Sequence, residues 1–180
     1  FRNKKLVVIQ NGSWFYLTAE GRAIEIDLDD DEGRYVDSIK PSNSYGVSVV
    51  RARKPKGPAE SCLVDKDGFR CSEFFETIHD YGDFYTGYTG QQEGSSSTFI
   101  LDAKTGDTIN SDPYLSFSRL RFSNGVYYFA VLENREVALI KIEKEGGRVK
   151  YKQLPPVGVA DFRKMNEGHN EGTVKVSFDY

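Results

Sequence analysis

The chain has 180 residues, a formal net charge of −3 and 38% hydrophobic residues. With 12 Phe, 11 Tyr, one Trp and few long helix-forming runs, the composition favours one β-rich core. Basic and acidic residues are interleaved, which argues against a nucleic-acid partner, and there is no apolar run of the roughly 18 residues that a transmembrane helix needs.

Residues 6–28 predict a three-stranded antiparallel meander. Two apolar runs, residues 6–9 and 14–17, flank Asn11-Gly12, a pair that accepts the positive φ angles of a type I′ hairpin turn. Gly21 is placed for a second turn, and residues 22–28 alternate apolar and polar side chains as a third strand would.

Further along the chain, short strands alternate with polar breaks. The acidic residues 27–33 predict a loop, and strands are expected at 35–39 and 45–50. The basic run 51–56 is interpreted as a solvated loop flank, and the polar run 91–97 as a flexible loop between units.

A strand followed by a turn glycine recurs at intervals of roughly 40 residues, at Gly21, Gly68, Gly106 and Gly146. This period predicts a single all-β domain over residues 1–180, made of about four antiparallel β-meander repeats. The units are placed at 1–57, 58–94, 95–134 and 135–171, with a closing strand at 172–180. The repeat length favours a propeller-like arrangement, with a β-sandwich or a barrel as the alternative.

Residues 7–21, VVIQNGSWFYLTAEG, resemble the tryptophan-glycine (WG) repeat family of bacterial β-repeat proteins. Residues 63–68 and 100–106 are similar to the turn portion of that repeat. The chain departs from the family where Phe15 follows Trp14, because the dipeptide that names the family is absent. The resemblance implies an all-β repeat that binds partners and has no common catalytic residues.

Two groups of residues could form a disulfide or bind a metal ion. Cys62 and Cys71 flank one predicted turn, so they form either a cross-strand disulfide in an oxidising compartment or two packed thiols. Asp27, Asp29 and Asp31 are a calcium candidate, because clustered carboxylates supply the oxygens that this ion needs. Their spacing departs from that of an EF-hand, so a solvated acidic loop is the favoured interpretation.

Catalytic chemistry is not predicted. His79 and Asp80 are neighbours on a predicted strand, which directs their side chains to opposite faces. The chain contains no nucleophile elbow, phosphate-binding loop or dinucleotide fingerprint. We therefore expect no catalytic residue and no cofactor.

Aromatic residues are dense enough that alternation should leave some rings on an outer face. The candidate binding residues are Tyr81, Phe84, Tyr85, Tyr88, Tyr127 and Tyr128. We expect a non-catalytic module that binds another protein, with a carbohydrate-binding or carbohydrate-processing protein using the same aromatic face as the first alternative. The second is an inhibitor or immunity-type protein, which the size and the pI near 5.5 suit. Phe1 in place of Met indicates a processed form or an excerpt, and a periplasmic, cell-surface or secreted location is favoured.

Overall fold

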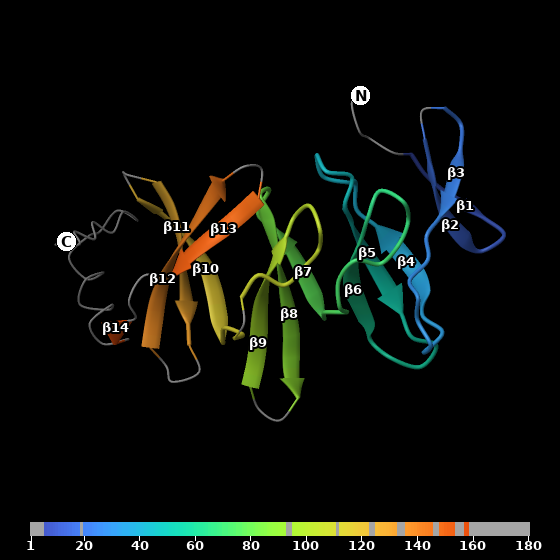
Figure 1. The fold of residues 1–180 in the computed structure, drawn as a ribbon. Helices are drawn as coiled ribbons and strands as arrows, with labels where there is room; N and C mark the ends of the chain where they lie inside the picture. Colours follow the sequence, from blue (N-terminus) through green and yellow to red (C-terminus); the bar gives the residue numbers. More distant parts are fainter. Residues whose placement is uncertain are drawn as a thin grey trace. The chain divides into compact units, whose positions relative to one another are not determined.

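The computed structural model describes residues 6–18, 20–92, 95–110, 112–122, 125–132, 136–145, 148–153 and 157–158. In these residues the regular secondary structure is β-strand and no helix occurs, which confirms the all-β prediction (Figure 1). The same residues therefore contain no helix that is long and apolar enough to cross a bilayer. The chain divides into two compact units, residues 1–89 with 100–109 and residues 90–99 with 110–180. The single domain, its repeat boundaries and the propeller-like arrangement stay predictions.

The first sheet is the predicted meander, with strands β1 (Leu6–Gln10), β2 (Ser13–Leu17) and β3 (Ala23–Glu25) in that order. Its first turn has φ angles of 51° at Asn11 and 85° at Gly12, as a type I′ hairpin requires. The opening hairpin is therefore confirmed. A third strand is present as well, but it covers only Ala23–Glu25 of the predicted residues 22–28.

The second sheet contains β4 (Tyr35–Ile39), β5 (Ser48–Arg53) and β6 (Ala59–Val64). Strand β5 runs through Arg53, so the interpretation of residues 51–56 as a loop flank is wrong for its first three residues. Ala52 is buried between the exposed Arg51 and the partly exposed Arg53, and this alternation is that of a strand with one solvated face.

The third sheet contains β7 (Thr77–Asp80), β8 (Phe84–Gln92) and β9 (Ser95–Asp102). The fourth contains β10 (Ser116–Phe122), β11 (Gly125–Val131), β12 (Glu136–Glu145) and β13 (Arg148–Gln153), with β14 (Val157–Gly158) paired to β12. The loop predicted over residues 91–97 is wrong, because most of that run lies in β8 and β9. The hydrogen bonds between neighbouring strands are made by the backbone, so polar residues can continue both strands. Gly146 and the closing strand predicted at 172–180 lie outside the described residues.

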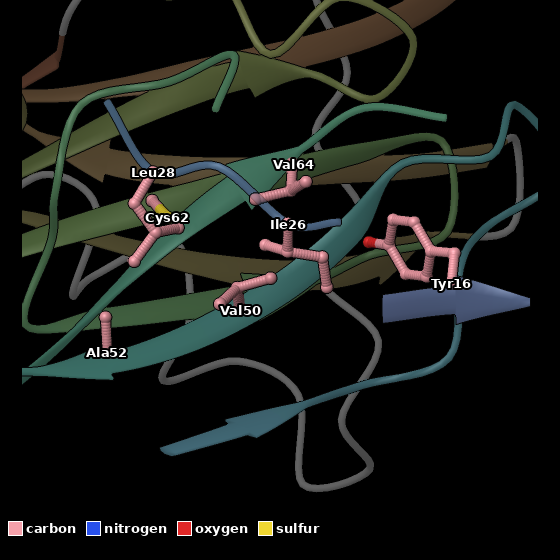
Figure 2. Packing of buried hydrophobic residues seen from close by; sticks show 7 residues of the cluster. All are labelled: Tyr16, Ile26, Leu28, Val50, Ala52, Cys62 and Val64. Atoms are coloured by element: carbon pink, nitrogen blue, oxygen red, sulfur yellow. The ribbon is translucent and has the colours of Figure 1, made fainter. Parts of the chain in front are cut away.

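A hydrophobic cluster joins the first two sheets. It brings together side chains from β2, from the segment after β3, and from β5 and β6 (Figure 2), namely Tyr16, Ile26, Leu28, Val50, Ala52, Cys62 and Val64. The side chains of Val7, Trp14 and Ile24 pack against the cluster from the first sheet. Both sheets are thus held in one core, and burial raises the pKa of Tyr16 to about 12.

Three of the predicted turns share two local features, although the turn that ends at Gly106 is one residue longer than the other two. Their glycines, Gly21, Gly68 and Gly106, have φ angles of 81°, 93° and 80°. The residue that begins each turn accepts backbone hydrogen bonds through its side chain, as in Asp65 Oδ1, which accepts from Asp67 N at 2.9 Å and Phe69 N at 3.0 Å. Thr18 and Asp102 act in the same way. A short polar side chain therefore fixes each turn, and glycine provides its left-handed residue.

Candidate functional site

The rings predicted to form an exposed aromatic face are mostly in the core. Phe84, Tyr85 and Tyr128 are buried, which corrects their placement on an outer face. Residues 84–87 at the start of β8 are all buried, so this part of the strand has no solvated face and the rings of Phe84 and Tyr85 are both covered. The side chains of two other candidates, Tyr81 and Tyr88, are partly exposed. The side chain of Tyr127 lies outside the described residues.

Both cysteines are free thiols. Val64 pairs with Arg70, and Cys71 N donates to Leu63 O at 2.9 Å, so Cys71 lies opposite Leu63 and one position away from Cys62. An offset of one residue puts the two cysteines on opposite faces of the pair of segments. Burial raises the pKa of each thiol to about 12, so both are protonated at neutral pH. The structure thus matches the packed-thiol alternative.

The acidic loop is held by its own backbone. Asp27 Oδ1 accepts a hydrogen bond from Asp29 N at 2.9 Å, and Asp29 has a φ angle of 45°, in the left-handed region that Asp tolerates. Asp31 is exposed. Among the described residues, no group of three or more His, Cys, Asp or Glu side chains is arranged to hold a metal ion.

His79 and Asp80 lie on β7, opposite Thr86 and Tyr85 respectively. Asp80 Oδ1 accepts a hydrogen bond from Gly82 N at 2.7 Å. This carboxylate therefore shapes the β7–β8 turn, and it is not placed as the orienting partner of His79.

A cavity of about 300 Å³ lies where the first sheet meets the start of β4. Two aromatic residues, Trp14 and Tyr35, line it together with the acidic loop and Arg34. Its volume is at the lower end of the range for small-ligand sites. It is the strongest candidate for a binding site in the described part of the chain.

The strand pairing places both aromatic residues. Trp14 pairs with Ile9 across the opening hairpin, and its carbonyl accepts a hydrogen bond from Ile26 N at 2.9 Å. Tyr35 begins β4 opposite Arg53 and is 51% exposed. In the described residues neither the indole N–H of Trp14 nor the hydroxyl of Tyr35 makes a hydrogen bond, so both polar groups are available to a ligand.

Arg34 is the only basic residue among those that line the cavity, and its charge is already compensated. Its side chain is 6% exposed and forms ion pairs with Asp30 and, at 2.8 Å, with Glu60. Its guanidinium carbon also lies 4.0 Å from the centre of the Phe74 ring, a cation–π contact. Glu60 and Asp30 raise the pKa of Arg34 against the opposing effect of burial. The cation is part of the structure and does not attract an anionic ligand.

The remaining charge of the cavity is negative. Asp27 and Asp29 also line it, and neither carboxylate forms an ion pair within the described residues. Carboxylates beside aromatic rings bind positively charged groups, because ring faces and carboxylates both attract cations. The same groups also suit sugar rings, which stack on aromatic side chains and donate hydroxyl hydrogen bonds.

A second cavity, of about 340 Å³, is lined by Arg70, Cys71, Gly106 and Asp107 among others. Arg70 donates to Leu28 O at 2.8 Å and to Ser72 O at 2.9 Å, so its guanidinium is largely committed to the backbone. The Cys71 thiol is protonated at neutral pH, as its raised pKa requires. This cavity therefore offers no uncommitted cation and no thiolate nucleophile.

Acid should weaken the Asp30–Arg34 pair in a measurable way. Burial alone would raise the pKa of Asp30, but hydrogen bonds from the backbone amides of Arg34 and Glu32 and the Arg34 charge hold it below its ordinary value. The pair thus stabilises the fold above about pH 4. This contribution is lost as the pH falls through the pKa that Asp30 has in the folded protein, which is below its ordinary value. The free energy of unfolding, measured with urea at several pH values in this range, should fall more steeply with decreasing pH for the wild type than for Asp30→Asn. Equal slopes would contradict the lowered pKa.

No family model, curated protein or solved structure matches the chain. Sequence reasoning missed the cavity and the role of Arg34. The available signals were the single Trp14 and the basic residue that directly follows the acidic loop, but neither shows which residues the fold brings together.

Proposed function

We propose that this chain is a non-catalytic interaction module on a β-repeat scaffold, and that its cavity receives a basic side chain of a protein partner. The observation that carries the proposal is the cavity itself, where Trp14 and Tyr35 have uncommitted polar groups beside unpaired carboxylates. The three turns that share a left-handed glycine and a polar first residue support the repeat scaffold. A propeller-like closure of these repeats is part of the proposal.

A cationic side chain suits this cavity better than an anionic one. Arg34 is neutralised by Asp30 and Glu60, so Asp27 and Asp29 dominate the field inside. A lysine or arginine of the partner would gain a cation–π contact and a charge-assisted hydrogen bond, each worth roughly 1 kcal/mol or more when desolvated. Binding should therefore weaken with salt.

The single Trp14 provides a direct readout, because no other tryptophan contributes to the fluorescence of the chain. Short peptides whose only charged side chain is one lysine or arginine are titrated while the Trp emission is recorded. The same peptides with glutamate in place of the basic residue are the comparison. We expect saturable changes with the basic peptides only. Tyr35→Ala and Asp29→Asn should weaken binding at least about tenfold, which is 1.4 kcal/mol.

Tyr45→Ala is the matched control, because Tyr45 is an exposed tyrosine that does not line the cavity. It should bind the peptides like the wild type. No saturable emission change with any basic peptide would reject the proposed partner chemistry.

A carbohydrate ligand is the second candidate, favoured by the two aromatic rings beside carboxylates. Titration with oligosaccharides under the same conditions separates the two functions. A saturable change with a glycan and none with the peptides would support the carbohydrate function, and Tyr35→Ala should remove it.

A further inference from the structure

Strand β1 forms one edge of the first sheet. In the described residues it pairs with β2 alone, and no isolated bridge lies on its outer side. The residues that close a two-residue turn form a hydrogen-bonded pair, and such pairs alternate along the hairpin, so Val7 and Ile9 direct their N–H and C=O groups away from β2. The carbonyl of Trp14, opposite Ile9, accepts from Ile26 N on the far side of β2, as this alternation requires. The edge thus presents backbone donors and acceptors to an incoming strand.

The second sheet shows what pairs with an edge of this type. Strands β5 and β6 correspond to β1 and β2, because each pair is antiparallel and leads directly into a turn with a left-handed glycine. Counted back from these turns, Val7 matches Val49. Strand β4 pairs antiparallel with the outer edge of β5, and Lys40 N, directly after β4, donates to Val49 O at 2.9 Å. The outward carbonyl of Val7 therefore matches one that an added strand already uses.

The side chains of β1 are exposed where those of β5 are covered. Residues 48–50 and 52 of β5 are buried, whereas Leu6 and Ile9 on β1 are 61% and 60% exposed. Leu6 and Ile9 are an odd number of positions apart, so they lie on opposite faces of the sheet. A partner packed on one face would cover only one of them. A strand added at the edge would place side chains beside both, because its own residues alternate between the two faces.

The two edge strands also differ in how they are protected. Strand β4, at the edge of the second sheet, has an irregular register between Val36 and Ser38 and carries the charge of Asp37. Bulges and charged side chains are common means by which edge strands avoid pairing with other chains. Strand β1 keeps a regular register over all of Leu6–Gln10, and its sequence, LVVIQ, contains no charge and no proline. Its edge is therefore regular, apolar and suited to a further strand.

We propose that the outer edge of β1 binds an extended segment of a partner protein, which pairs antiparallel with Val7 and Ile9 and continues the first sheet as β4 continues the second. Backbone hydrogen bonds provide the affinity, and the exposed side chains of Leu6 and Ile9 select apolar residues at neighbouring positions of the segment. None of the residues of β1 lines the cavity. This interaction goes beyond the proposed function, and either can fail without the other.

A short peptide of alternating valine and threonine residues, blocked at both termini and with a glutamate near each end, is the probe. It has no basic residue, so it lacks the group that the acidic cavity is proposed to receive. Titration of the labelled peptide with the protein, up to about 1 mM, should give a saturable rise in fluorescence anisotropy. The same peptide with N-methylated backbone amides cannot donate to the edge and should bind at least tenfold more weakly. No saturable change, or equal binding of the two peptides, would overturn the proposal.

Ile9→Pro and Ile9→Thr separate the backbone from the side chain. Proline removes the outward N–H of Ile9, which the pairing with β2 does not use, so binding should fall at least tenfold while the urea midpoint stays close to that of the wild type. Ile9→Thr retains the N–H and a β-branched side chain, and it should bind more tightly than Ile9→Pro. Asp29→Asn alters only the cavity and should bind the peptide like the wild type.

Three results with these proteins would overturn the proposal. Equal losses for Ile9→Pro and Ile9→Thr would show that the backbone of the edge does not bind the peptide. A loss with Asp29→Asn would place the peptide in the cavity. A wild type that sediments as a dimer without peptide, and that Ile9→Pro makes monomeric, would show that the edge pairs with a second copy of the chain.

Discussion

Replacing Gly68 with alanine should lower the free energy of unfolding by at least about 3 kcal/mol. Two separate effects add at this position. The φ angle of 93° is strained for any residue with a Cβ atom, and the added methyl group would overlap Glu25 O at 2.3 Å and contact the Ile24 Cγ2 atom at 3.0 Å. The carbonyl belongs to the backbone of β3, so relief of the overlap would require the turn to separate from the first sheet. Urea unfolding by circular dichroism gives the change directly.

Gly82→Ala is the control that separates strain from overlap. Gly82 has a φ angle of 89°, almost that of Gly68, but no atom lies within 4 Å of its Cβ position. Its substitution should cost only about 1–2 kcal/mol, the price of the left-handed conformation alone. Equal losses for the two variants would show that the close approach to Glu25 contributes nothing.

A second pair repeats the comparison in the neighbouring turns. Gly106 and Gly21 have φ angles of 80° and 81°, but only the Cβ position of Gly106 overlaps a backbone carbonyl, that of Cys71. Gly106→Ala should therefore destabilise the chain more than Gly21→Ala does. A reversed order would contradict the packing of each turn on the backbone that follows the preceding one.

The local structure was predictable where one short segment determines it. Asn11-Gly12 encodes its own turn, and the turn glycines at 21, 68 and 106 have the positive φ angles that their placement predicts. These features depend on neighbours within a few residues. The length of β8 and β9 was not predictable in the same way, because backbone pairing across a hairpin places few demands on exposed side chains.

The candidate site was less predictable because it depends on contacts between distant segments. Arg34 and Glu60 are 26 positions apart, and the Phe74 ring that contacts Arg34 comes from still further along the chain. Composition indicates that some aromatic rings must be exposed, but it cannot say which. Phe84 and Tyr85 are buried since β8 begins with both faces covered, whereas Tyr35 is half-exposed at the start of β4.

Arg34→Ala should be the second severe substitution, with an expected loss of about 3–5 kcal/mol in the free energy of unfolding. The change removes the partner of the buried Asp30 and of Glu60, and it also removes the cation over the Phe74 ring. A buried carboxylate without its counter-ion must either remain charged at high cost or take up a proton. Arg53→Ala is the control, because Arg53 forms only an exposed pair with Asp37 at 3.9 Å, and it should cost less than about 1 kcal/mol.

A double-mutant cycle shows that the loss comes from the pair. Asp30→Asn removes the carboxylate charge that Arg34→Ala leaves unpaired, so the two changes together should cost less than the sum of the single changes. The coupling between neighbouring charged residues is expected to lie between about 0.5 and 3 kcal/mol. Arg34→Lys should rescue little, because a lysine cannot reproduce the several directed hydrogen bonds that Arg34 donates to Asp30 and Glu60. Simple additivity of the two changes, with full rescue by lysine, would mean that Arg34 acts only through its general positive charge.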